Sequence, residues 1–99
     1  MIFRRAPFHD VVSRQLEIFA TDEADGLLAE VQELKRLYDR AGSGDAEEAY
    51  GDYEDAVEAV KEALAEMRDR YAATLGDGAA AEYEAAFEDA ARRRWRWLA

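Results

Sequence analysis

The most regular hydrophobic pattern in the chain runs through residues 45–75. Its inward positions are Tyr50, Tyr53, Val57, Val60, Leu64, Met67, Tyr71 and Thr74. They follow one another in steps of three and four, which average about 3.5 residues, the repeat that keeps one side of an α-helix turned toward a neighbouring helix. The pattern therefore predicts one long helix over residues 45–75 that packs side by side with other helices.

The N-terminal third of the chain continues almost the same rhythm. Its inward positions are Val12, Leu16, Phe19, Ala24, Leu27, Val31, Leu34 and Tyr38. Pro7 suits the first turn of a helix, where a backbone N–H is not needed. Thr21 and Asp22 can cap a new helix, and Gly26 weakens a helix interior by about 1 kcal/mol, so a break between them is the alternative. Because the apolar stripe stays in phase across this segment, we expect one helix over residues 7–41, bent near its middle.

Two glycine clusters separate the long segments. Residues 42–44 and 76–78 lie where glycine ends one helix, and each cluster carries or precedes an aspartate that can cap the next. In the last segment, residues 79–98, the inward positions are Tyr83, Phe87, Ala90, Arg94 and Leu98. Short loops make consecutive helices antiparallel, and no segment alternates with the period of a β-strand. The sequence therefore predicts an all-α fold, a single helical domain over residues 1–99. We expect an up-down-up antiparallel three-helix bundle, a long helical hairpin with a shorter third helix.

The unequal helix lengths lead to a functional prediction. At about 1.5 Å per residue the three helices span roughly 50, 45 and 30 Å, so the third helix stops about halfway along the hairpin. Near residues 42–44 two helices alone cannot bury both sides of the apolar stripe. We expect a second copy of the chain, as a homodimer, or another protein to cover this hairpin end through Val31, Leu34, Leu37, Tyr38, Tyr50 and Tyr53. The alternatives are a third helix that is longer or placed differently, or tyrosines that lie flat with their hydroxyls in water.

Composition excludes several classes of function. The chain of 99 residues suffices for one modest core, and its lack of cysteine excludes disulfides and thiolate metal sites. Its net charge of −10 would repel the phosphates of nucleic acid, which argues against a nucleic-acid partner. No apolar run approaches the ~18 residues that cross a bilayer, and no secretory signal is recognisable, so we expect a cytoplasmic protein.

Acidic residues dominate the start of the long helix. Between Asp45 and Glu66 there are nine carboxylates and one lysine, including an i, i+4 series, and like charges at that spacing repel. The series consists of Glu54, Glu58, Glu62 and Glu66. A basic partner or a divalent cation docked there is one interpretation. The other, which we favour, places Arg92, Arg93 and Arg96 of the third helix beside Asp55, Glu58 and Glu62 of the second.

The C-terminal segment is the most unusual. Residues 92–97 interleave four arginines with Trp95 and Trp97, a combination that can contact an anionic membrane surface or stack on nucleic-acid bases. We expect instead that Trp95 or Leu98 closes the bundle, because four charges are few for such recognition and the rest of the chain is acidic. Trp95 and Trp97 are therefore candidate contact residues in either interpretation.

Catalytic chemistry has little support in the sequence. His9 is the only histidine, and Ser13 and Ser43 are the only serines, with no glycine-rich turn around either. A di-iron bundle needs Glu-x-x-His, but Ala6 lies three residues before His9. We therefore expect no enzyme, no metal and no cofactor. The sequence predicts a small non-catalytic interaction protein, an adaptor or accessory subunit that self-associates through the hairpin end. The alternative is a peripheral tether that uses the C-terminal Arg/Trp segment.

Overall fold

The computed structural model describes residues 7–22 and 26–98, and its architecture is entirely α-helical over these ranges. The helices are α1 (His9–Asp22), α2 (Leu27–Arg40), α3 (Ala46–Ala72) and α4 (Asp77–Arg94), followed by a short 3₁₀ turn, η1 (Arg96–Leu98). No strand occurs within the described ranges. The all-α prediction is confirmed, but four α-helices stand where three were expected. Ala24, placed in the N-terminal apolar stripe, lies outside the described residues.

The prediction of one helix over residues 7–41 was wrong. Helix α1 ends at Asp22 and α2 begins at Leu27, and Gly26 between them has a φ of +67°, a left-handed conformation that glycine adopts without steric cost. The Gly26 carbonyl accepts the first hydrogen bond of α2, from the N–H of Glu30 at 2.9 Å. Gly26, which the sequence analysis considered as a destabilising residue inside one helix, is therefore the N-terminal cap residue of a second helix.

The other helices differ from the prediction at their ends. Helix α3 spans residues 46–72 rather than 45–75, and Asp45 stands at its N-terminal cap, where its carbonyl accepts the N–H of Ala49. Helix α4 begins at Asp77 and stops at Arg94, short of the predicted end at Leu98. Trp95 is extended there, with φ −124° and ψ 92°, and η1 follows it. This change of direction turns the end of the chain back toward the core.

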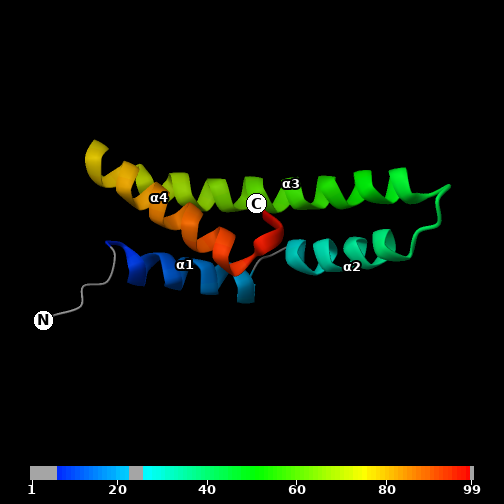
Figure 1. The fold of residues 1–99 in the computed structure, drawn as a ribbon. Coiled ribbons are helices and arrows are strands. Elements are labelled where there is room, and N and C mark those ends of the chain that lie inside the picture. Colours follow the sequence, from blue (N-terminus) through cyan, green and yellow to red (C-terminus); the bar gives the residue numbers. More distant parts are fainter. Residues whose placement is uncertain (1–6, 23–25, 99) are drawn as a thin grey trace, which may run out of the picture.

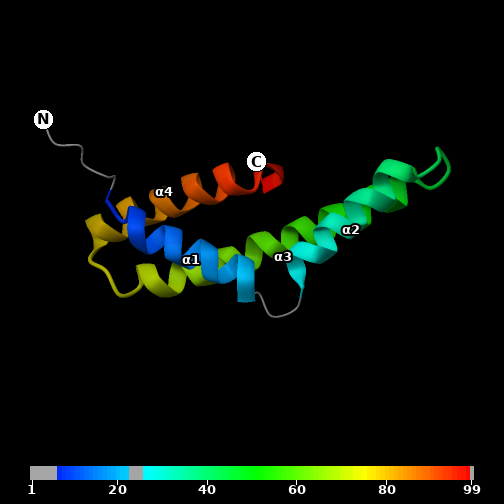
Figure 2. The same ribbon diagram turned by 90° about the horizontal axis from the view of Figure 1, so that it is seen from below.

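The helices form a long hairpin with a partial third layer. Helices α1 and α2 follow each other along one side and α3 runs antiparallel along the other, while α4 returns diagonally over α1 and the C-terminal half of α3 (Figures 1 and 2). Helix α2 packs on α3, beside the half of α3 that follows the loop between them (Figure 1). The result is an elongated molecule of 56 × 32 × 22 Å, in which α1, α3 and α4 surround a core at one end and α2 packs on α3 at the other.

The core lies mainly among α1, α3 and α4. Its buried side chains are Val12, Leu16 and Phe19 of α1, Val31 of α2, Ala56, Val57, Val60, Leu64 and Ala72 of α3, and Tyr83, Phe87 and Ala91 of α4. Tyr83 is completely buried, and its ring contacts Phe8, Tyr71 and Phe87 at centroid distances of 5.6, 4.7 and 5.9 Å. Its hydroxyl donates a 2.7 Å hydrogen bond to Oε1 of Gln15, which joins α4 to α1.

Candidate interaction surfaces

The six residues predicted at the hairpin end occupy three different environments. Val31 is buried and belongs to the core between α2 and α3, so its side chain presents no surface to a partner. Leu34, Tyr38 and Tyr53 are half-buried. Leu37 and Tyr50 are each 44% exposed, which makes them two of the three large hydrophobic residues most open to solvent among those described. The hairpin end therefore offers apolar side chains, but fewer than predicted.

Three tyrosines form a cluster on one face of the hairpin end. Tyr38 of α2 lies between two tyrosines of α3: its ring is tilted against Tyr50 at 5.3 Å and stacked on Tyr53 at 6.4 Å. Rings at these distances attract one another by offset and edge contacts, so they hold α2 against α3 near the loop. We call Tyr38, Tyr50 and Tyr53 the tyrosine cluster.

Charged residues border the tyrosine cluster without covering it. Nζ of Lys35 donates to both carboxylate oxygens of Asp39 at 2.7 and 2.8 Å, and this hydrogen bond raises the pKa of Lys35. A hydrogen bond to the Glu54 carboxylate, one helical turn away, raises the pKa of Tyr50. The border therefore combines both signs of charge.

Leu34 and Leu37 belong to the opposite face of the hairpin. They line a shallow groove between α2 and α3 together with Ala49 and Asp52, and no member of the tyrosine cluster lines it. Asp52 follows Tyr50 by two residues, and two residues turn by about 200° around a helix. The sequence-based prediction placed Leu34 and Leu37 on the same surface as the three tyrosines. Helical periodicity applied to α2 alone, where Leu34, Leu37 and Ala41 recur at i+3 and i+4, would have separated the two faces.

The arginines of the C-terminal segment pair differently from the prediction. Within the described ranges none of Arg92, Arg93 and Arg96 forms an ion pair with Asp55, Glu58 or Glu62, and that part of the prediction was wrong. Their helix lies over the C-terminal half of α3 instead of its start (Figure 2).

The ion pairs of Arg92 and Glu88 lie within α4 or join α4 to the C-terminal half of α3. Arg92 pairs within α4, with Asp89 at 3.0 Å (i, i+3) and with Glu88 at 4.0 Å (i, i+4). Glu88 also accepts a 2.7 Å hydrogen bond from Arg68 of α3. The acids at the start of α3 thus have no basic partner from α4.

The two tryptophans pack within the chain. Trp95 meets Phe19 of α1 edge to face, with ring centroids 5.8 Å apart, and the guanidinium of Arg94 lies over its ring at 5.3 Å. Trp97 and Leu98 are half-buried against the core. The Arg/Trp segment therefore lies near the middle of the molecule (Figure 1), where Trp95 and Leu98 pack on the core, as the preferred interpretation of the sequence expected.

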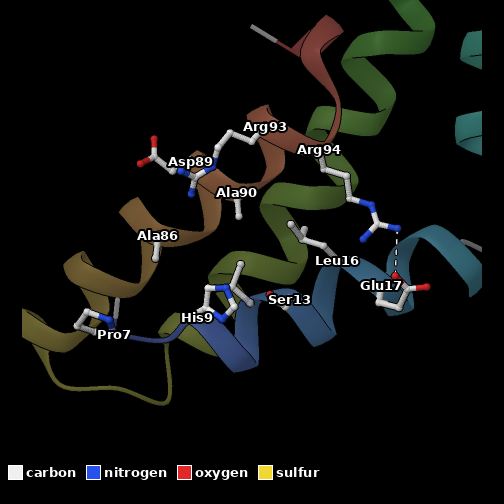
Figure 3. Close-up of a pocket in the computed structure, with 11 residues that line it drawn as sticks. Pro7, His9, Ser13, Leu16, Glu17, Ala86, Asp89, Ala90, Arg93 and Arg94 are labelled. Atoms are coloured by element: carbon white, nitrogen blue, oxygen red, sulfur yellow. Dashed lines mark hydrogen bonds and ion pairs between the residues drawn. The ribbon is translucent and has the colours of Figure 1, made fainter. Parts of the chain in front are cut away.

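A groove of about 740 Å³ separates α1 from α4 (Figure 3). Its floor is apolar, and one end is crossed by the 3.1 Å ion pair between Arg94 and Glu17. His9 and Ser13 stand on the α1 side and Arg93 on the α4 side. The imidazole of His9 lies 3.2 Å from the Asp10 carboxylate, while the Ser13 hydroxyl forms no hydrogen bond to another side chain in the described part of the chain.

Two further structural findings concern metals and membranes. Over residues 7–22 and 26–98 no three His, Asp or Glu side chains converge as metal ligands would. Within the same residues no helix combines the length and the apolar character needed to cross a bilayer.

Comparison of the chain with models of protein families, with curated proteins and with solved structures finds no significant match.

Proposed function

We propose that this protein is a small non-catalytic interaction protein, an adaptor or accessory subunit, and that it self-associates through the tyrosine cluster. One observation carries the proposal. The tyrosine cluster continues a face of α3 that α4 and η1 cover at the other end of the molecule.

The register of α3 supports this continuity. Tyr50, Lys61 and Arg68 are separated by eleven and seven residues, close to whole numbers of helical turns, so they lie on the same side of the helix. Arg68 binds Glu88 of α4, and Leu98 of η1 lies beside Lys61 in a shared depression. Toward the hairpin loop this face carries Tyr50 with no helix above it (Figure 1).

The side chains of this face are chemically suited to contact a second copy of the chain. Tyrosines supply large contact area at a low cost in side-chain entropy, and their hydroxyls tolerate water before association. A two-fold axis would place one cluster on the other, so that each hairpin end supplies the third layer that its partner lacks. The paired charges Lys35 and Asp39 at the border limit repulsion between two acidic chains.

The packing of the C-terminal segment favours self-association over a membrane or nucleic-acid tether. Trp95 and Trp97 contribute to the core of their own chain, and a tether would have to release them.

Light scattering after size exclusion tests self-association. At about 100 µM, a concentration that populates dimers of micromolar Kd, we expect a mass near twice the chain mass of 11.2 kDa. Tyr50→Asp should return the mass to that of one chain. Ile18→Asp is the matched control, since Ile18 is 51% exposed on α1, and it should leave the dimer intact. A wild-type chain that stays at 11.2 kDa would refute the proposal.

A further inference from the structure

The face of the hairpin opposite the tyrosine cluster carries a shallow groove that is lined by both apolar and acidic residues. Two depressions of about 420 and 300 Å³ share Leu34 and Asp52 and thus form one groove between α2 and α3. Its apolar lining consists of Leu34, Leu37, Ala41, Ala49, Ala56 and Ala59. We call this surface the leucine groove. Because four of its six apolar residues are alanines, a helix could approach its floor closely.

The polar residues of the leucine groove are all acidic. They are Glu30, Asp45, Glu48, Asp52 and Asp55, and neither lysine nor arginine lines either depression. None of the five forms an ion pair within the described part of the chain. An acidic border around an apolar floor attracts a ligand that is apolar in the middle and basic at its edges, and repels an acidic one.

We propose that the leucine groove binds an amphipathic helix of a partner protein, one with an apolar stripe flanked by lysine or arginine. The groove follows α3 from Asp45 to Ala59, about 21 Å, which matches a helix of about four turns. The mode is that of a helix laid in a hydrophobic groove, with apolar residues at i, i+3, i+4 and i+7 as anchors. A second copy of this chain fits the groove poorly, because it would bring one acidic border against another.

This proposal stands apart from self-association. No residue of the tyrosine cluster lines the leucine groove, so each surface can be varied without replacing a residue of the other. The protein could bind a basic helix as a monomer or as a dimer.

A synthetic leucine–lysine peptide of about 14 residues, with helical amphipathic spacing and a fluorescent label, is the probe. Fluorescence anisotropy at low salt should show saturable binding, weakened by added salt, and a leucine–glutamate peptide of the same spacing should not bind. Glu48→Lys should weaken binding by about threefold to tenfold, because it replaces an attraction by a repulsion. Glu47→Lys is the matched control: Glu47 also lies exposed in the first turn of α3 but does not line the groove.

The apolar floor is tested separately from the charge. Leu37→Ser should weaken binding of the leucine–lysine peptide to a similar degree. Ile18→Ser, at another exposed apolar residue, should leave that binding unchanged. An equal loss with Glu47→Lys and Glu48→Lys would assign binding to net charge alone and overturn the proposal. So would absence of peptide binding to the wild type. Loss of self-association in Glu48→Lys would place a second copy in the groove and overturn it as well.

Discussion

At the scale of single residues, Tyr83 determines how α4 is held against the rest of the molecule. Its ring is the centre of the aromatic contacts, and its hydroxyl is bonded to Gln15 of α1. Periodicity identified Tyr83 as an inward residue. It could not identify Gln15 as the partner, because the two residues are 68 positions apart and Gln15 is not part of the apolar pattern.

Replacement of Tyr83 by phenylalanine should have a small effect at neutral pH. The change removes one hydrogen bond, worth about 0.5–1.5 kcal/mol, and we expect the low end of that range because half-buried Gln15 can turn to water. The free energy of unfolding, measured by urea denaturation of wild type and Tyr83→Phe near neutral pH, gives this difference directly. A loss of several kcal/mol would mean that the hydroxyl supports more than the bond to Gln15.

The same pair of proteins should differ in alkaline solution. Burial raises the pKa of Tyr83 above its ordinary value of 10.0, although the hydrogen bond to Gln15 works in the opposite direction. In the unfolded chain Tyr83 loses its proton near pH 10, while the folded chain keeps it, so its stabilising effect is complete below that pH and declines as pH rises further. Urea denaturation between about pH 8 and about pH 11, around the ordinary tyrosine pKa, should show a steeper decline for wild type than for Tyr83→Phe. Parallel curves would contradict this.

At the scale of the helices, the start of α2 shows what the apolar pattern leaves open. The stripe runs in phase along the sequence from α1 into α2, and such a stripe is compatible both with one continuous helix and with two successive helices. Gly26, which directly precedes α2, has a left-handed backbone conformation with a φ of +67°. Periodicity records where side chains point and not the sign of one backbone angle, so the sequence alone left the break undecided.

Two glycine-to-alanine variants should change stability in opposite directions. Gly26→Ala should destabilise the fold by about 1 kcal/mol, because a Cβ at positive φ is strained even though no other atom lies within 4 Å of its position. Gly51→Ala, within α3 and equally unobstructed, should stabilise it by about 0.5–1 kcal/mol through helix propensity. Thermal or urea unfolding followed by circular dichroism compares the two, and a stabilising Gly26→Ala would exclude the left-handed joint.

Other helix ends show where sequence reasoning succeeds. The boundaries of α3 were predicted to within three residues, because Asp45 and the glycines beside it stop both the apolar rhythm and the helix. The end of α4 was placed four residues too late, since the rhythm through Leu98 continues past the point where Trp95 becomes extended. The contact of Trp95 with Phe19, a tertiary contact, gives a physical reason for that turn. For the interaction surfaces, the sequence pattern pointed to the hairpin end. It did not show that Leu37 and Tyr50 lie on opposite faces of that end.

At the scale of the whole molecule, the uneven distribution of the core determines how the fold should open. Val60, Leu64 and Phe87 are buried among three helices, whereas α2 contributes only Val31 to the buried core. Local stability follows buried apolar contact, so the hairpin end should open without unfolding the rest. Self-association through the tyrosine cluster would then stabilise that end, because binding to the folded form alone shifts its equilibrium by mass action.

Hydrogen exchange measured at two protein concentrations tests both statements together. At low concentration, amides of residues 27–41 and 46–56 should exchange faster than those of residues 60–72 and 83–91. Raising the concentration above the dimer Kd should slow exchange in the first two ranges and leave the others unchanged. In Tyr50→Asp the fast exchange should persist at both concentrations. Uniform exchange along the chain would show that the hairpin end is as stable as the rest of the molecule and would contradict local opening. Exchange in residues 27–41 that does not depend on concentration would contradict self-association through the tyrosine cluster.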